Sequence, residues 1–535
     1  MANHTRNRAV RVTATVTALA AAMSLAAPVA AAETGPSSSE SPYLIPAADG
    51  VATVAILTVG DTPTNDPSYR MVGIPDGLGA YRNVAHGRSE SDADDRHRGG
   101  RTFTLLANHE LRAEQGRVRA HGAPGSFVSK WTIDRRSLEV VAGEDLIQYV
   151  RTWGAGSWNA PAKGIALNRL CSADLPAESA FYDQRSQRGY RGQIFLSGEE
   201  AGNEGRPFGH LLDGTSYELA HLGNMSYENI VANAETGTRT MVAALDDQTN
   251  GQVYVYLGDK QRSGNPIERA GLAGGALHGV RIIGMPQEPD APLAQQPLRF
   301  ELASLGDVAD RTGAEIEAES NALGVTRFLR PEDGAWDPNE PRDFYFVTTD
   351  NYDSTKPEGA SSPGGTNGHS RLWRLRFDDL GDPASGGTVT PLLAGTEIHQ
   401  MLDNMTVDTT GHVLIQEDPG NQTRSAKIWQ YTIATGELKL IARHDPVRFG
   451  ESQPPRYAPQ LPAAAPATTD EESSGIIPAF DILGPGWFLL DVQAHTAPRP
   501  PFTSLQPELV EDGQFLALYN PDSDWTRKGV GARGR

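Results

Sequence analysis

The chain has 535 residues, and its 67 Asp and Glu side chains outnumber its 47 Lys and Arg side chains, which gives a formal net charge of −20. This balance argues against nucleic-acid binding, because that activity depends on a basic surface. A single cysteine, Cys171, excludes an internal disulfide and leaves one thiol to explain.

The N-terminus has the three parts of a secretory signal peptide. Arg6, Arg8 and Arg11 form a basic region, Val12–Leu25 is a short apolar run, and Ala30-Ala31-Ala32 offers a cleavage site. A membrane anchor is the alternative, but the apolar run is shorter than the roughly 20 residues that span a bilayer. We therefore expect residues 1–32 to be a cleaved signal peptide, with cleavage near Ala32, and the protein to be secreted with no membrane span.

Beyond the signal, the pattern is typical of β-structure. Short runs rich in Val, Ile, Phe, Tyr and Trp are separated by Gly, Pro, Asn and Asp, as in strands joined by turns. One short helix is expected at Ala314–Glu319. The clearest strand predictions are Val51–Val59, Thr102–Leu106, Gln193–Leu196, Thr240–Ala244, Gln252–Leu257, Asp343–Thr348, Arg371–Phe377, His412–Gln416, Lys427–Thr432, Leu438–Ala442 and Gly486–Val492.

The strand pattern repeats along the chain. An apolar run ends at an acidic residue, a polar loop follows, and an aromatic-rich run comes next; residues 344–347, Asp350 and residues 372–375 form one such unit. Repeats of this size predict an all-β fold, a β-propeller with six irregular blades and loop insertions. A two-sheet sandwich is the alternative, but about 450 residues would make a very large one.

The domain boundaries follow from composition. We expect an extended lead at residues 33–50 and the propeller, as the catalytic domain, at residues 51–504. Within it, Gln453–Thr469 is rich in Pro and Ala and is interpreted as a surface loop. Residues 505–535 end in basic side chains and are expected to form a peripheral C-terminal extension.

Acidic residues close many of the predicted strands. Strand ends from different repeats converge at one opening of a propeller, where clustered carboxylates cannot stay ionised without cations. A solvated loop explains any single acidic pair, but several pairs together indicate bound metal ions. Carboxylate and amide oxygens suit Ca²⁺, Fe³⁺ or Mn²⁺. The acidic strand ends are Gly198-Glu199-Glu200, Tyr227-Glu228-Asn229, Asp246-Asp247, Arg330-Pro331-Glu332-Asp333, Asp350-Asn351, Asp403-Asn404 and Glu417-Asp418.

Familiar catalytic signatures are missing, including G-x-S-x-G, H-E-x-x-H and the P-loop. Two acidic spots offer more than a carboxylate. Arg330 lies two residues from Glu332, so both side chains can face one side of an extended segment, where the guanidinium suits phosphate or carboxylate. A local ion pair is the alternative. Asn108-His109-Glu110 presents an amide, an imidazole and a carboxylate at one strand end.

These motifs together resemble the PhoX-type alkaline phosphatases, a family of secreted β-propellers that use calcium and iron. The shared motifs run in order through most of the chain, and none is specific alone. They are Asn108-His109-Glu110, Cys171, Gly198-Glu199-Glu200, Tyr227-Glu228-Asn229 with Asp246-Asp247, Arg330-Pro331-Glu332, Asp403-Asn404, Glu472-Ser473-Ser474-Gly475 and Asp491-Val492-Gln493-Ala494-His495.

The resemblance implies roles for individual residues. Cys171 is then an iron ligand rather than a buried apolar side chain, and Arg330 and Asn108 contact the phosphate. The pairs Glu199/Glu200 and Asp246/Asp247 leave an ambiguity of one residue. The implied metal ligands are Cys171, Glu199, Glu228, Asp247, Glu332, Asp403 and Glu472.

The leading hypothesis is therefore an exported, metal-dependent phosphomonoesterase, a monomer that hydrolyses small phosphate esters at a multinuclear site of Ca²⁺ and Fe³⁺. A calcium-dependent propeller lactonase is one alternative, which needs no cysteine and fewer acids. A non-enzymatic exported binding protein, with only structural calcium, is the other.

Overall fold

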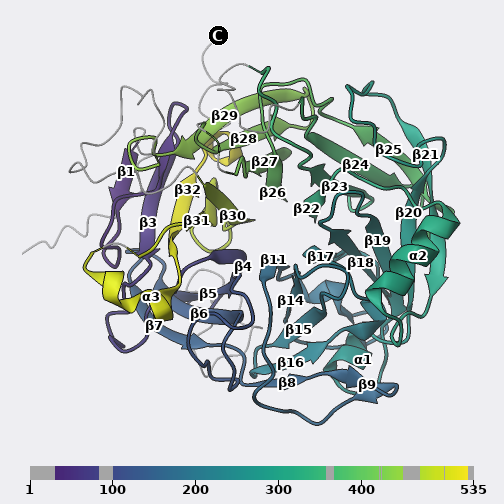
Figure 1. The fold of residues 1–535 in the computed structure, drawn as a ribbon, viewed down its shortest axis with the longest axis horizontal. Coiled ribbons are helices and arrows are strands. Elements are labelled where there is room, and N and C mark those ends of the chain that lie inside the picture. Colours follow the sequence, from purple (N-terminus) through teal and green to yellow (C-terminus); the bar gives the residue numbers. More distant parts are fainter. Residues whose placement is uncertain are drawn as a thin grey trace, which may run out of the picture.

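Six four-stranded antiparallel blades surround a central axis in the described residues of the computed structural model (Figure 1). The structure describes residues 31–83, 100–356, 367–420, 422, 424–449, 470–498 and 500–527. The innermost strands of the blades contact one another in a closed cycle, β4 to β11, β17, β22, β26, β30 and back to β4. The predicted all-β propeller is thereby confirmed.

We number the blades along the chain and give the strands of each from the axis outward. Blade 1 contains β4 (Pro75–Arg82), β5 (Thr102–His109), β6 (Phe127–Asp134) and β7 (Val140–Asp145). Blade 2 contains β11 (Leu170–Asp174), β14 (Ile194–Glu199), β15 (Pro207–Leu211) and β16 (Thr215–Glu218), with β8 (Tyr149–Arg151) at its edge. Blade 3 contains β17 (Tyr227–Ala232), β18 (Arg239–Asp246), β19 (Val253–Asp259) and β20 (Ala276–Ile282).

The second half of the chain forms the other three blades. Blade 4 contains β22 (Pro331–Trp336), β23 (Asp343–Thr348), β24 (Arg371–Phe377) and β25 (Gly387–Pro391). Blade 5 contains β26 (Leu402–Val407), β27 (His412–Glu417), β28 (Lys427–Thr432) and β29 (Glu437–His444), with β2 (Leu44–Pro46) at its edge. Blade 6 contains β30 (Glu471–Pro478), β31 (Trp487–Ala494), β32 (Asp512–Tyr519) and β3 (Ala52–Thr58), with β1 (Ala31–Thr34) at its edge.

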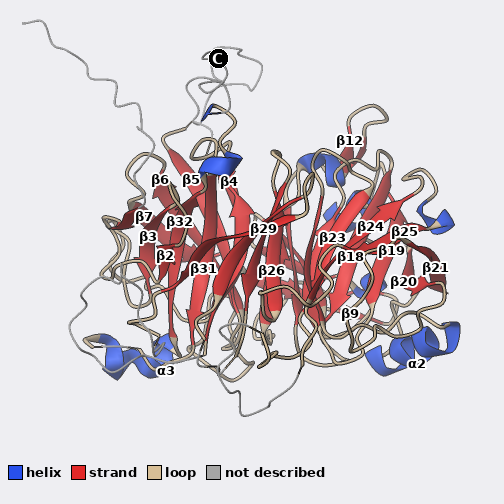
Figure 2. Ribbon diagram, turned by 90° about the horizontal axis from the view of Figure 1, so that it is seen from above, coloured by secondary structure: helices blue, strands red, loops and turns tan. Residues whose placement is uncertain are grey.

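Further strands and helices lie outside the six four-stranded blades. β21 (Leu298–Gly306) pairs with both β20 and β25 and so joins blades 3 and 4 at their outer edges. The remaining strands are β9 (Trp153–Gly154), β10 (Ser157–Trp158), β12 (Tyr182–Asp183) and β13 (Arg188–Gly189). The α-helices are α1 (Pro266–Ala270), α2 (Gly313–Leu323) and α3 (Gln506–Leu509), and α2 and α3 lie at one rim of the ring (Figure 2). In the described residues, no helix has the length and apolar character needed to cross a membrane.

The buried apolar side chains form one cluster at each of the six interfaces between neighbouring blades. Strand β23 shows why both of its faces are apolar. Phe344 and Phe346 pack toward blade 3, while Tyr345 and Val347 pack toward blade 5. Successive side chains of a strand point to opposite faces, so a strand between two other blades needs apolar residues at almost every position. This packing explains why the predicted strand runs are confirmed.

The predicted helix at residues 314–319 is also confirmed, as the longer α2. The Thr312 side chain caps its N-terminus, and the Glu315 carboxylate accepts a hydrogen bond from the backbone N–H of Thr312. Gly324 ends the helix with φ +71°, a conformation that costs glycine little.

The C-terminal boundary at residue 504 needs correction. Strand β32 lies between β31 and β3, all eight of its residues are buried, and the propeller therefore extends to Tyr519. Blade 6 is built from both ends of the chain, since β3 precedes blade 1 in sequence and pairs with β32. The expected lead also contributes β2 and part of β1 to the outer edges of two blades. The predicted signal region up to residue 30 and the predicted loop Gln453–Thr469 lie outside the described residues.

Candidate metal centre

Each of the six innermost strands carries an acid or a thiol at its second residue. We call this set the inner ring. In blades 1 to 5 the pairing with the next strand shifts register at this position, as between Leu402 and Met405 of β26. In blade 6 the shift comes slightly later, between Ser474 and Ile477. A β-bulge redirects a side chain, so the repeated bulge explains how these groups leave the sheet plane. The inner ring consists of Asp76, Cys171, Glu228, Glu332, Asp403 and Glu472.

A second ring follows the same repeat. In every blade, the residue directly after the second strand donates its backbone N–H to the carbonyl of the residue two positions before the inner-ring side chain, at 2.8–3.4 Å. In blade 1, for example, Glu110 N–H donates to Ile74. This bond places the second ring beside the inner ring. The second ring consists of Glu110, Glu200, Asp247, Thr349, Asp418 and His495.

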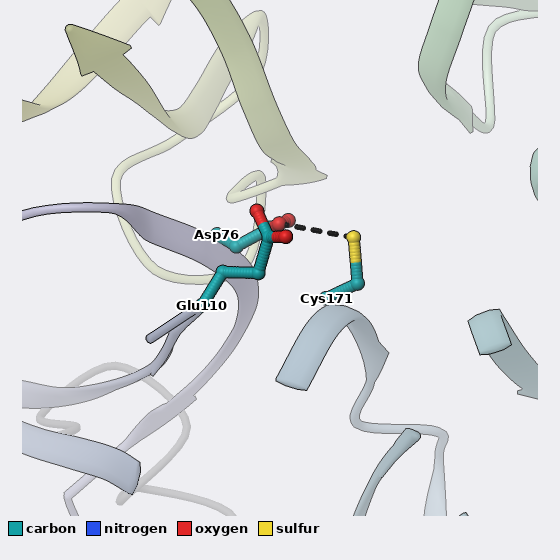
Figure 3. Close-up of side chains that lie close together, drawn as sticks. All are labelled: Asp76, Glu110 and Cys171. Atoms are coloured by element: carbon teal, nitrogen blue, oxygen red, sulfur yellow. Dashed lines mark hydrogen bonds between the residues drawn. The ribbon is translucent and has the colours of Figure 1, made fainter. Parts of the chain in front are cut away.

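Ligand-type atoms of the two rings fall into three overlapping groups, each with its atoms within 4.8 Å of one another. Cys171 belongs to two groups and Glu228 to two, so the groups form a connected series. The Cys171 thiol lies 3.2 Å from Asp76 Oδ2 and 3.1 Å from Glu228 Oε2. Figure 3 shows the thiol directed at Asp76, with Glu110 beside it. The groups are Asp76, Glu110 and Cys171; Cys171, Glu200 and Glu228; and Glu228, Glu332 and Asp403.

A close approach between two inner strands makes this contact possible. Gly77 follows Asp76, and a Cβ atom at Gly77 would lie 2.2 Å from the backbone nitrogen of Ala173. Only glycine therefore lets β4 come near enough to β11 for Asp76 to reach Cys171.

The electrostatics of the rings call for positive charge. Burial, reinforced by the charge of Glu110, raises the pKa of Asp76 to about 8. Burial, with the nearby Asp76 and Glu228, also raises the pKa of the Cys171 thiol. Burial is likewise the main cause that raises the pKa of the remaining inner-ring acids, Glu228, Glu332, Asp403 and Glu472. Crowded, buried carboxyls retain protons unless cations replace them.

Unpaired acceptor atoms mark the same place. Among the described residues, several buried oxygens around the rings have no hydrogen-bond donor and no ion pair: Asp76 Oδ1, Asn108 Oδ1, Glu332 Oε2, Asn404 Oδ1 and Gln493 Oε1. Buried polar atoms are normally satisfied, and these are all acceptors, which cations complement. Oxygen ligands with one thiolate therefore fit a group of hard cations in which one or two ions accept sulfur.

Arg330 supplies positive charge beside the two rings. Its Nε and Nη2 donate to the two oxygens of Asp247 at 2.9 Å each, and Nη2 lies 3.0 Å from Glu332 Oε1. Glu332, and after it Asp247, raise the pKa of Arg330 against the opposing effect of burial. The backbone of Arg330 has φ +60°, which a non-glycine residue rarely adopts. Such strain is characteristic of functional sites.

The structure separates the two ambiguous pairs. Glu199 accepts two hydrogen bonds from Arg206, at 2.7 Å each, and two more from backbone N–H groups. Glu200 instead lies in the group with Cys171 and Glu228. In the second pair, Asp246 accepts from Ser226 and Gln248, whereas Asp247 faces Arg330. The geometry favours Glu200 over the predicted Glu199. Asp247 rather than Asp246 lies beside Arg330, and its role as a metal ligand stays a prediction.

The three side chains of Asn108-His109-Glu110 point to different places. The Asn108 amide donates to the carbonyls of Cys171 and Ser172, at 2.5 and 3.5 Å, so here it supports β11. His109 is buried against Phe127, away from the rings, and burial lowers its pKa to about 3. Only Glu110 joins the metal-ligand groups. The contact of Asn108 with phosphate stays a prediction, and it requires the amide to release a carbonyl.

Not every acidic strand end serves the centre. Glu417 is held by Arg424, and both side chains are fully buried. Asp350 accepts from the backbone of His369 and from Asn351. Both acids have partners of their own.

Sequence reasoning missed Asp76 of the inner ring and Arg169 beside it, and it did not assign Glu110 or Asp418 as a ligand. The signal for Asp76 was present, because Pro75-Asp76-Gly77 repeats the order Pro331-Glu332-Asp333 at the start of another inner strand. Glu110 and Asp418 each follow a strand and could have been grouped with Asp247.

The fold is a closed six-bladed propeller whose inner strands carry a crowded ring of acids and one thiol, which form a candidate metal centre. Comparison with known proteins identifies the kind. The family model "Alkaline phosphatase PhoX" matches residues 210–458, which include Glu228, Asp247, Arg330, Glu332 and Asp403. Over these residues the chain is similar to the PhoX-type alkaline phosphatases, and it is a phosphatase. The resemblance seen in the sequence is confirmed, and the phosphatase hypothesis holds over the lactonase and binding-protein alternatives.

The solved structures agree on the fold. PhoX of Pseudomonas fluorescens, in complex with the transition-state analogue vanadate, has 12% identity and a TM-score of 0.56 over 89% of this chain and 95% of its own. A proposed 6-phosphogluconolactonase of Bacteroides uniformis covers 63% of this chain and 80% of its own, at 10% identity and a TM-score of only 0.29. That second likeness supports no inference. Comparison with curated proteins gives no match to this chain.

The first prediction concerns the pH dependence of the metal-free protein. Asp76 holds a proton up to about pH 8 when folded but ionises near pH 4 when unfolded, so the folded state binds more protons between these values. Stability should therefore be greatest below about pH 4 to 5 and decline toward pH 8, by at most about 1.4 kcal/mol per pH unit for each such group. Urea unfolding in chelator at pH 5, 7 and 9 measures this. Added Ca²⁺ should abolish the decline, and a midpoint that rises with pH in chelator would contradict the account.

The second prediction separates two adjacent glutamates. Glu200→Gln should lower the metal content of the purified protein, since it removes a charge from a ligand group. Glu199→Gln should leave the metal content near the wild-type level but lower the free energy of unfolding by about 2 kcal/mol, because it breaks the pair with Arg206. Elemental analysis of the purified proteins and urea unfolding measure the two effects. The reverse assignment would show that Glu199 is the ligand.

Proposed function

We propose that the two rings hold a multinuclear centre of calcium and iron at which small phosphate monoesters are hydrolysed. The observation that carries this proposal is the sharing of Cys171 and Glu228 between successive ligand groups. Shared ligands are what neighbouring metal ions need in order to lie a few ångströms apart. The crowded, unpaired acceptors support the same conclusion.

The residues divide into a sulfur part and an oxygen part. Cys171, with Asp76, Glu110, Glu200 and Glu228 around it, would hold iron, because a thiolate suits iron better than calcium. Glu332 and Asp403, together with Glu228, offer only oxygens and suit calcium. Asp247 and Glu472 complete the proposed set at its margin. Bound cations supply charge neutralisation and an activated oxygen nucleophile.

The protein's own contribution is to bind and orient the phosphate. Arg330 is held by Asp247 and Glu332, which fixes the plane of its guanidinium without filling all its donors. Planar N–H donors stabilise the equatorial oxygens of a transferring phosphoryl group. The strained backbone at Arg330 aims the side chain at the opening, and Asn108 would donate a further hydrogen bond. Both roles concern positioning, since phosphoryl transfer needs little covalent help from side chains.

The site of action is proposed to lie outside the cytoplasm. The basic, apolar and small-residue parts of residues 1–32 support export with cleavage near Ala32. The net charge of −20 supports small esters rather than nucleic acid as substrates, and the protein is proposed to act as a monomer.

The test of this function compares two arginines of blade 4. Arg330→Ala should lower kcat/KM for p-nitrophenyl phosphate by about 100-fold or more, because it removes a charged donor to the transition state. Arg342 pairs with Glu340 in the turn between β22 and β23, with 42% of its side chain exposed, and Arg342→Ala should change the rate less than twofold. Circular dichroism should show both variants folded.

Near-normal turnover of folded Arg330→Ala would contradict the proposed clamp. Glu332→Gln provides a separate control of the metal centre. It should lower metal content as well as activity, and full metal content in an inactive Glu332→Gln protein would remove Glu332 from the ligand set.

A further inference from the structure

Arg169 occupies in blade 2 the position that Arg330 occupies in blade 4. Each arginine lies two residues before the inner-ring side chain of its blade, Cys171 or Glu332. Each has a left-handed backbone, with φ +49° at Arg169 and +60° at Arg330. The carbonyl of each accepts the backbone N–H of the second-ring residue of its own blade. The two side chains therefore start from equivalent points around the axis.

The contacts of the two guanidinium groups are similar, although the acid of the own blade belongs to the inner ring for Arg330 and to the second ring for Arg169. Each reaches back to the second-ring acid of the preceding blade, Arg330 to Asp247 and Arg169 to Glu110, whose Oε1 lies 2.6 Å from Nε. Each also pairs with an acid of its own blade, Arg330 with Glu332 and Arg169 with Glu200. In both side chains Nε and Nη2 make all of these bonds. Among the described residues, Nη1 of either arginine has no partner.

Both arginines remain accessible to a ligand. The side chains of Arg169 and Arg330 are 38% and 32% exposed, although their carboxylate partners are nearly buried. Two other arginines of the propeller, Arg371 and Arg424, are instead 0% exposed together with their acidic partners. The partly exposed guanidinium groups of Arg169 and Arg330 therefore keep a donor for a ligand.

The two arginines lie two blades apart, with Glu228 of blade 3 between them. A ligand that contacts both arginines therefore spans the position of blade 3. Guanidinium N–H pairs recognise carboxylate or phosphate, and each such charged hydrogen bond discriminates strongly against a neutral group.

We propose that Arg169 is a second anion-binding residue, which contacts an anionic group on the alcohol portion of the substrate. The preferred substrates are then phosphate esters that carry a further anionic group, either a carboxylate or another phosphate. This inference rests on the proposed function of the same site and adds the substrate class to it.

The test uses two matched pairs of esters. 3-Phosphoglycerate differs from glycerol 3-phosphate by a carboxylate, and fructose 1,6-bisphosphate differs from fructose 6-phosphate by a phosphate. In Arg169→Gln holoenzyme, KM for the doubly anionic member should rise about tenfold or more, while KM for the singly anionic member stays within twofold. The pair with the larger rise identifies the group that is read. Arg281→Gln is the matched control, because Arg281 is 41% exposed and pairs with Glu301 on the outer strands.

Two outcomes would overturn the inference. Equal losses on both members of each pair, with loss of metal by elemental analysis, would mean that Arg169 only positions Glu110 and Glu200. Unchanged KM values on all four esters would mean that it contacts no substrate. If Arg169→Gln fails to fold, Arg169→Lys keeps the charge and loses the planar fork, and it should show the same selective rise. Wild-type protein that hydrolyses none of the esters would instead refute the proposed function.

Discussion

Repulsion between carboxylates that a closed ring of strands holds together is the constraint on which the centre depends. The innermost strands cannot move apart without breaking the ring, so the inner-ring side chains stay within a few ångströms. Without cations the acids must retain protons, as the raised pKa of Asp76 indicates. Cations would relieve the repulsion, satisfy the unpaired oxygens and bring a positive field to a protein of net charge −20, which anionic esters require.

The fold supplies this arrangement by repeating one local design. In blades 1 to 5 the inner strand begins with a bulge that redirects its second side chain. In all six blades the residue after the second strand donates a backbone hydrogen bond to the residue two positions before that side chain. Small departures from the repeat then create function. Gly77 allows β4 to approach β11, so that Asp76 contacts Cys171. Arg169 and Arg330, at equivalent positions of two blades, provide hydrogen-bond donors for anions. The apolar clusters between blades make the frame rigid enough to keep these groups in place.

Much of this architecture was predictable because it depends on local patterns in the sequence. Both faces of a blade strand are buried, so runs such as residues 343–348 are apolar throughout and stand out between polar turns. The position of Glu228, Glu332 and Asp403 at the ends of strands likewise indicated that they belong to the site. Pairing between distant segments leaves no local pattern. The sequence therefore predicts a peripheral extension at residues 505–535, where β32 in fact pairs with β3 from the other end of the chain. The choice between Glu199 and Glu200 also depended on a tertiary contact, the ion pair with Arg206.

The central claim is that ions occupy the series of ligand groups joined by Cys171 and Glu228. Anomalous X-ray diffraction from crystals of protein purified through its native export route, recorded at the iron edge and at a longer wavelength for calcium, tests it most directly. The account predicts iron within bonding distance of the Cys171 sulfur and calcium beside Glu332 and Asp403. Crystals of fully active protein with no anomalous peak inside the two rings would contradict it.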